Sequence, residues 1–168
     1  MTQISRLKEF FEHKDGCIYW LVARNSRGGL TEIGSRAGYV APNGYRYVGV
    51  DGKRLLEHRV IFALIHGRWP ANSLDHINRI PTDNRPENLR ECTHAENLQN
   101  TKLRSDNSTG VKGVSWDKSR NLYAAELIVN GKKKYLGRFK TLEEAAFVRA
   151  GAVAKFHPFS APSHAHRA

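Results

Sequence analysis

The alternation of hydrophobic and polar positions predicts short helices and short strands in the first third of the chain. Residues 3–12 have helical spacing of apolar positions and predict an amphipathic helix. Residues 17–23 are rich in β-branched and aromatic side chains and predict a strand. Residues 45–50 and 53–56 predict a β-hairpin, because the Asp51-Gly52 dipeptide between them suits a two-residue turn.

The middle of the chain predicts a helix followed by a hairpin and a second helix. Residues 57–66 carry apolar side chains on one helical face, and Gly67 is placed to end that helix. Residues 73–77 and 87–92 predict two strands around a polar loop. Residues 93–96 then form a Thr-x-x-Glu capping box, which opens a further helix.

The last third predicts a three-stranded antiparallel sheet packed by one helix. The strands are expected at 111–116, 122–129 and 133–139, with Asn130-Gly131 as the turn between the last two. A second capping box at 141–144 opens an amphipathic helix that would cover the sheet. The sequence therefore predicts an α+β protein.

The charge of the chain indicates an anionic partner. Its formal net charge is +11, and residues 101–140 contain ten Lys or Arg against three Asp or Glu. Such a balance is typical of proteins that bind nucleic acid, an anionic membrane surface or a ribosome. No apolar run approaches the roughly 18 residues of a membrane span, so no membrane partner is expected. Cys17 and Cys92 form no CxxC pair, which argues against structural zinc and for a reducing cytoplasm.

Four polar residues form the strongest chemical pattern. Asp75 and His76 place a carboxylate beside an imidazole, Asn88 follows 12 residues after His76, and Asn97 follows 9 residues later. A carboxylate and an amide oxygen can hold one hard divalent cation. An imidazole with an ordinary pKa of about 6.5 is largely neutral at pH 7 and can take a proton from water. The pattern favours metal-assisted hydrolysis of a phosphodiester.

Residues 58–100 resemble the HNH endonuclease motif in the form carried by phage and intron homing endonucleases. His76 matches the first H, Asn88 the central N, and Asn97 the final position, where Asn replaces His. The resemblance implies a ββα-metal core with His76 as general base and Asn88 as a loop-orienting residue. It also implies that Asp75 and Asn97 hold one divalent cation, Mg²⁺ or Mn²⁺.

Two further histidines near the motif have open interpretations. His58 stands just before the motif, where it could support the site or pack as a capping or loop histidine. His94 stands at the start of the predicted active-site helix, where it could approach a phosphate or face solvent.

The C-terminal segments 113–116, 135–139 and 141–146 resemble the APETALA2-type DNA-binding domain of plant transcription factors. That family lays its three-stranded sheet in the major groove of DNA. Here Tyr replaces Trp at positions 123 and 135, and Lys replaces several Arg, which makes fewer bidentate base contacts. The residues expected to contact DNA are Arg46, Lys53, Arg54, Lys112, Trp116, Lys118, Arg120, Tyr123, Lys132, Lys133, Lys134 and Arg138.

These patterns predict three modules and a tail: a basic β-rich module (1–56), the nuclease core (57–104), the DNA-binding domain (105–160) and residues 161–168. The predicted function is divalent-metal-dependent cleavage or nicking of double-stranded DNA by a monomeric, homing-type HNH endonuclease. Its expected place is the cytoplasm, that of the host cell if a phage encodes it. One alternative is a non-catalytic DNA-binding regulator that retains the HNH scaffold. Another is an RNA-binding accessory protein, because charge alone does not separate RNA from DNA.

Overall fold

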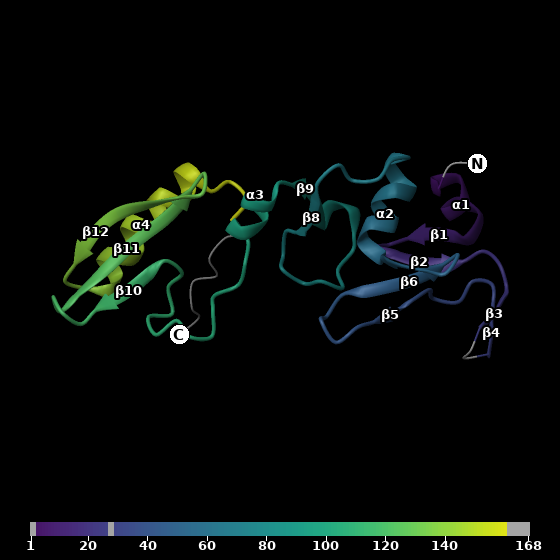
Figure 1. The fold of residues 1–168 in the computed structure, drawn as a ribbon, viewed down its shortest axis with the longest axis horizontal. Coiled ribbons are helices and arrows are strands. Elements are labelled where there is room, and N and C mark those ends of the chain that lie inside the picture. The colour runs from purple at the N-terminus through teal and green to yellow at the C-terminus, as the bar shows by residue number, and fades with distance from the viewer. Residues whose placement is uncertain (1–2, 27–28, 161–168) are drawn as a thin grey trace. The chain divides into compact units, whose positions relative to one another are not determined.

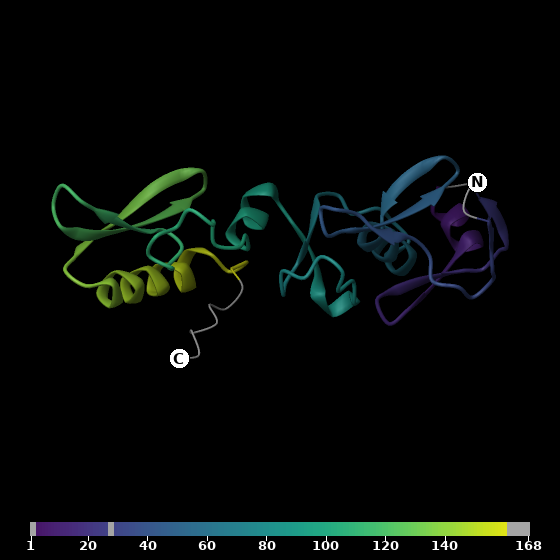
Figure 2. The same cartoon turned by 90° about the horizontal axis from the view of Figure 1, so that it is seen from below.

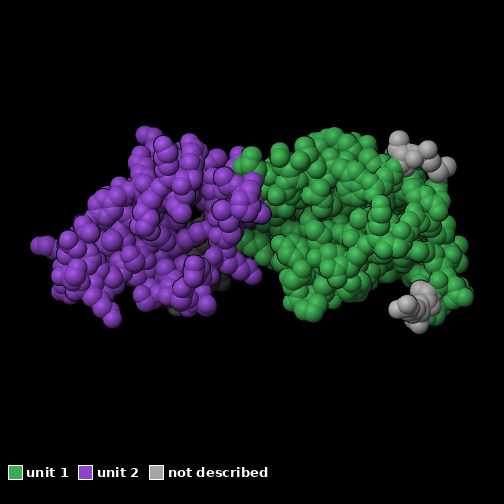
Figure 3. Space-filling view, in the orientation of Figure 1, with its two compact units in different colours: residues 1–93 green, residues 94–168 purple. Residues whose placement is uncertain are grey.

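The computed structural model describes residues 3–26 and 29–160, so the predicted tail at 161–168 lies outside the described residues. Helices alternate with several small antiparallel sheets, which confirms the α+β class (Figure 1). The chain divides into two compact units, residues 1–93 and residues 94–168 (Figure 3). Among the described residues, no helix is long and apolar enough to cross a membrane.

The first unit contains two α-helices, one short 3₁₀ helix and four small sheets. Its sheets pair β1 with β2, β3 with β4, β5 with β6 and β7, and β8 with β9, all antiparallel. In chain order the elements are α1 (Gln3–Phe10), β1 (Phe11–Lys14), β2 (Cys17–Trp20), β3 (Arg24–Ser26), β4 (Gly29–Thr31), β5 (Tyr39–Val40), β6 (Arg46–Val50), β7 (Lys53–Leu56), α2 (Glu57–His66), β8 (Ser73–His76), η1 (Pro86–Asn88) and β9 (Leu89–Cys92).

One hydrophobic core joins the two ends of this unit. It takes buried side chains from α1, β1, β2, β6 and α2, so residues before and after position 56 pack against one another. The predicted module boundary at 56/57 therefore falls inside a shared core. The least exposed of its large side chains are Leu7, Ile18, Val48, Val60 and Ile61.

Two elements with strong local signals form as predicted. Helix α2 covers 57–66 and ends at Gly67, whose φ of 67° is left-handed and whose N–H bonds to Ala63 O. The hairpin of β6 and β7 pairs Val50 with Lys53 across the Asp-Gly turn. A left-handed backbone is accessible to glycine at little cost, which explains why the helix stops there.

The first helix is shorter than its sequence pattern predicts. Helix α1 ends at Phe10, and Phe11 begins β1 instead of continuing the helix to residue 12. Phe11 pairs with Trp20 across the β1–β2 hairpin, with ring centroids 4.6 Å apart, and is only 3% exposed. Burial of this aromatic pair outweighs the helical periodicity at the end of α1.

The second unit contains α3 (His94–Gln99), β10 (Val114–Asp117), β11 (Leu122–Val129), β12 (Lys132–Phe139) and α4 (Leu142–Phe156). The strands pair in the order β10-β11-β12, and α4 packs along one face of the sheet (Figure 2). The first strand begins at Val114, three residues later than predicted. Asn130 and Gly131 form the β11–β12 turn with φ of 51° and 75°. Helix α4 begins with both hydrogen bonds of the predicted Thr141–Glu144 capping box.

Candidate active site around His76

The β8–β9 hairpin places Asp75 and His76 at the end of one strand. Both side chains are buried, with 7% and 6% of the residue exposed. Asp75 lies opposite Arg90 in the antiparallel register, and its Oδ2 accepts hydrogen bonds from Arg90 Nε at 3.0 Å and Nη2 at 2.7 Å. The guanidinium therefore compensates a carboxylate that would be costly to bury alone.

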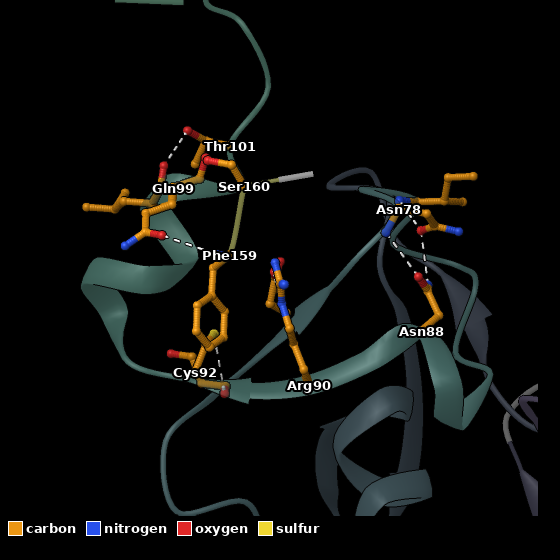
Figure 4. Close-up of polar contacts among 12 residues, drawn as sticks. Asn78, Asn88, Arg90, Cys92, Gln99, Thr101, Phe159 and Ser160 are labelled. Carbon is orange, nitrogen blue, oxygen red and sulfur yellow. Dashed lines mark hydrogen bonds and ion pairs between the residues drawn. The ribbon is translucent and has the colours of Figure 1, made fainter. Parts of the chain in front are cut away.

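Asn88 closes the loop that follows His76. Its Oδ1 accepts a bond from Asn78 N at 3.0 Å, and its Nδ2 donates to Asn78 Oδ1 at 3.0 Å (Figure 4). Nδ2 also donates to Asp83 O at 2.7 Å. The main chain adds a bond from Ile77 N to Asn88 O at 2.9 Å. These bonds hold the first residues after His76, a geometry that suits the loop-orienting role predicted for Asn88.

A buried hydrogen-bonded chain leads from His76 to helix α2. His76 Nε2 lies 2.8 Å from Asn84 Oδ1, and Asn84 Nδ2 donates to Glu57 Oε2 at 2.7 Å. Asn84 is 1% exposed and Glu57 0%. Two arginines pair with the Glu57 carboxylate, Arg36 Nη2 at 3.0 Å from Oε1 and Arg46 Nε at 3.1 Å from Oε2.

His58 packs directly against His76. The two ring centroids are 5.0 Å apart, with an edge-on angle of 79°. His58 is 4% exposed, and its buried Nδ1 has no hydrogen-bond partner among the described residues. Burial, with smaller contributions from the neighbouring His76 and Arg59, lowers the pKa of His58 to about 3. His58 is thus a neutral packing partner of the candidate base at pH 7.

A glycine turn presses on the same loop from the β1–β2 hairpin. Gly16 has a φ of 72°, and a Cβ added there would meet Arg85 N at 2.6 Å. No side chain could be placed at Gly16 without displacing that backbone. Arg85 follows Asn84 directly, so the hairpin turn bears on the segment that holds His76.

With this geometry described, comparison with known proteins gives one family. Residues 56–99 match the HNH endonuclease family. The match spans α2, β8, β9 and α3, and it supports an HNH-type nuclease acting on DNA.

The chain is also similar to "Protein 3.8" of Escherichia phage T7, with 32% identity over 75 residues. That alignment covers 45% of this chain and 62% of the phage protein, so the chain spans less than two thirds of its relative. No solved structure matches significantly.

HNH nucleases generally use a divalent metal ion, so the oxygens available here matter. Within residues 3–26 and 29–160, no group of three or more His, Cys, Asp or Glu is arranged to hold a metal. The predicted pair, a carboxylate from Asp75 and an amide from Asn97, supplies hard oxygen donors of the kind Mg²⁺ prefers. Asn97 lies half-buried on α3 in the second unit, so its pairing with Asp75 on one cation stays a prediction. Near it, His94 begins α3 and is exposed.

Two cationic side chains predicted to contact DNA instead make contacts within the protein. The Arg46 side chain is only 17% exposed because it pairs with Glu57 and donates to Ala37 O at 3.1 Å. Lys112 directs Nζ at carbonyl oxygens near the end of α3, including Leu98 O at 3.2 Å and Gln99 O at 3.1 Å. The prediction for both residues assumed exposed cations, and the fold uses them internally. Lys53 and Arg54 of β7 remain exposed as expected.

The carbonyl end of α3 receives a second set of contacts from within its unit. Gln99 Oε1 accepts from Phe159 N at 3.3 Å, and Gln99 O accepts from Ser160 Oγ at 3.3 Å (Figure 4). The chain after α4 is thereby tied back to α3, next to the Lys112 contacts.

The sheet of the second unit divides the remaining candidates between its two faces. Cross-strand partners share a face, and the register aligns Ala124 with Arg138 and Ile128 with Lys133 on the face opposite α4. Lys134 lies on the other face, with Nζ 4.3 Å from the centroid of the Phe156 ring of α4. The three lysines at 132–134 therefore do not form one surface.

The aromatic candidates and the other cations lie as follows. Trp116 and Tyr123 pack on each other with centroids 4.7 Å apart, and Trp116 is 36% exposed. Arg138 pairs with Asp117 at 3.1 Å, and Lys133 pairs with Glu126 at 2.8 Å. Lys132 is exposed and lies opposite Val129 in the register. Lys118 and Arg120 are exposed between β10 and β11, and Arg120 pairs with Asp117 at 3.4 Å.

The principal omission of the sequence reasoning is the pair Glu57 and Asn84. Asn84 belongs to the phrase Asn-Arg-Pro-Glu-Asn-Leu that marks the motif, and Glu57 stands next to His58. Glu57 begins a predicted helix and Asn84 lies in a polar loop between Asp83 and Arg85, so neither residue stands out in the sequence. Only the three-dimensional contact shows that they meet at His76.

Proposed function

We propose that this protein is a divalent-metal-dependent, homing-type HNH endonuclease that hydrolyses phosphodiester bonds of double-stranded DNA. The observation that carries the proposal is the buried imidazole of His76, placed beside Asp75 and above a loop tied by Asn88. This arrangement lies within the 56–99 segment that matches HNH endonucleases.

Each residue has a separate chemical task in this proposal. His76 takes the proton of the attacking water, which raises the nucleophilicity of the oxygen at the scissile phosphate. Asp75 and Asn97 hold the cation, Mg²⁺ or Mn²⁺, by their oxygens. When bound, the cation supplies positive charge at the scissile phosphate and at the leaving 3′ oxygen. Asn88 keeps the loop after His76 in place.

The second unit would hold the DNA. Residues 101–140 carry a net charge of +7, and the sheet face opposite α4 presents Lys133, Tyr135 and Arg138. We propose that this face approaches the duplex as an APETALA2-type sheet does. A monomer with one active site would nick one strand. The phage relative favours action in the cytoplasm of a host cell.

A supercoiled plasmid tests the proposal. With Mg²⁺ we expect nicked circles, and with EDTA none. His76→Ala should slow the reaction on the order of 10²–10⁴-fold, because a general base typically contributes that much, while leaving duplex binding unchanged. His66→Ala, an exposed histidine of α2, is the matched control and should cut as the parent does.

Two results would contradict the proposal. Cleavage by His76→Ala at the parental rate would remove His76 as the base. Binding of duplex DNA by the parent without any cleavage would favour the non-catalytic DNA-binding regulator.

A further inference from the structure

The contact between Asn84 and His76 determines more than the position of the ring. Three buried groups follow one another from α2 to β8: the Glu57 carboxylate, the Asn84 amide and the His76 imidazole. Each of the three residues is at most 6% exposed, so water does not compete for these bonds. The donor and the acceptor of each hydrogen bond in this series of three side chains can be deduced from the chemistry of the groups that it joins.

The carboxylate fixes the orientation of the amide. A carboxylate only accepts hydrogen bonds, so the atom of Asn84 that lies 2.7 Å from Glu57 Oε2 must be the amide nitrogen. The carbonyl oxygen of Asn84 then faces His76. Glu57 is in turn held by Arg36 and Arg46, which keep a buried negative charge compensated.

The amide then fixes the tautomer of the imidazole. A carbonyl oxygen also only accepts, so the His76 nitrogen 2.8 Å away, Nε2, must carry the hydrogen. In a neutral imidazole the other nitrogen, Nδ1, then bears the lone pair. We infer that Asn84, oriented by Glu57, is a positioning residue that makes Nδ1 the proton-accepting atom of His76; this rests on the proposed role of His76 as general base.

The packing of His58 restricts rotation of the His76 ring. A ring flip would be needed to present the other nitrogen to Asn84, and His58 packs edge-on against the His76 ring with centroids 5.0 Å apart. Tyr45 also lies near, 6.0 Å from His76 and 5.7 Å from His58. Packing against His58 and Tyr45 holds the ring in place, and the directed hydrogen bond to Asn84 selects one of the two neutral forms.

The tautomer can be measured directly in the full chain by long-range ¹H–¹⁵N correlation of the histidine rings. The spectrum is recorded well above the ordinary imidazole pKa of about 6.5. We expect His76 to carry its hydrogen on Nε2. Hydrogen on Nδ1 in the parent protein would overturn the inference without any variant.

Two substitutions separate positioning from simple packing. Asn84→Leu keeps the volume but removes the acceptor, so we expect a mixture of tautomers and a roughly 10–100-fold lower kcat on plasmid, with duplex affinity unchanged. Asn84→Asp keeps an acceptor oxygen beside His76, and one proton shared with Glu57 replaces the amide donor at the 2.7 Å contact, so the Nε2–H form should persist. Asn72→Leu, at an exposed asparagine before β8, is the matched control and should change neither reading. A pure Nε2–H form in Asn84→Leu would overturn the inference.

The positioning role of Asn84 and the nuclease proposal can fail independently. An active enzyme whose His76 is protonated on Nδ1 overturns the positioning role and leaves the nuclease proposal standing. A protein with the Nε2–H form that never cuts DNA overturns the nuclease proposal and with it the catalytic meaning of the tautomer.

Discussion

The two units of the chain place their polar side chains in opposite ways. Among described residues, the second unit buries one polar residue, Asn100, and exposes most of its cations, although Lys112 and Arg149 are half-buried. Its segment 101–140 holds +7 of the net charge of +11. The first unit buries six polar residues around one hairpin: Glu57, His58, Asp75, His76, Asn84 and Asn88.

The sizes of the two hydrophobic cores explain why only the first unit can bury a group of polar side chains. Burying a polar group is costly unless its hydrogen bonds are replaced, and any mismatch must be offset by apolar burial elsewhere. The core cluster of the first unit has ten buried residues, and that of the second has three. Fixed geometry for chemistry is therefore expected in the first unit, and surface charge for binding a polyanion in the second.

Removing the predicted metal ligands, Asp75 in the first unit and Asn97 in the second, should have the largest effect on cleavage. Asp75→Ala and Asn97→Ala should each lower plasmid cleavage on the order of 10²-fold or more, since a catalytic cation contributes several kcal/mol. The Mg²⁺ concentration for half-maximal activity should rise. Asp106→Ala, at an exposed aspartate, is the control. An unchanged metal titration in both variants would remove Asp75 and Asn97 as ligands.

Loss of the loop tie should reduce stability. Asn88→Ala removes three hydrogen bonds and leaves Asn78 Oδ1 and Asp83 O with fewer partners. We expect the free energy of unfolding to fall by about 1–3 kcal/mol. Urea denaturation measures it, with Asn72→Ala as control. A change no larger than that of the control would show that the loop is held by other contacts.

The buried His58 should make the stability of the first unit depend on pH. The folded protein protonates His58 only near a pKa of about 3, whereas the unfolded chain does so near 6.5, so acid favours the unfolded state. The contribution is complete above about pH 6.5 and declines as the pH falls. At pH 5 the loss is about 2 kcal/mol.

Urea denaturation between pH 7 and pH 5 measures this dependence. His58→Phe keeps an aromatic ring beside His76 but cannot be protonated, so its stability should fall less over the same range. Equal slopes for the parent and this variant would show that His58 is not the group responsible.

The smallest effect is expected from substitution of surface cations, and the change in DNA affinity shows which unit binds the duplex. Lys133→Gln with Arg138→Gln should lower duplex affinity several-fold and make the salt dependence shallower, because each phosphate contact contributes about −0.9 to the log–log slope. Lys53→Gln with Arg54→Gln is the matching pair in the first unit. Fluorescence anisotropy on random-sequence duplex gives both values. A larger loss from the first-unit pair would assign DNA binding to the first unit.

The sequence predicts those parts of the molecule whose signals are local. Helix α2 and its Gly67 end follow from neighbouring residues, as does the β6–β7 turn. The same holds for Asp75 and His76, which are adjacent. The short strands β3, β4 and β5 have no comparable signal, since two or three residues carry little periodicity.

Contacts between distant positions could not be predicted in this way. Glu57 and Asn84 are 27 positions apart, and their meeting depends on how α2 packs against the loop. Arg46 alternates with apolar residues as an exposed strand cation would, yet its partner, Glu57, lies on the next helix. Charge pattern alone cannot distinguish a buried ion pair from a phosphate contact, because both require the same guanidinium.

The contact between Gly16 and Arg85 has a consequence for how such genes can exchange parts. A cassette cut at the limits of the family match, 56–99, would carry His76, the proposed general base, into a new host protein. It would leave behind the side-chain-free turn at Gly16 and the arginines that neutralise Glu57. Recombination that preserves activity should therefore transfer the preceding 40 or so residues as well, or meet a recipient that already has their equivalents.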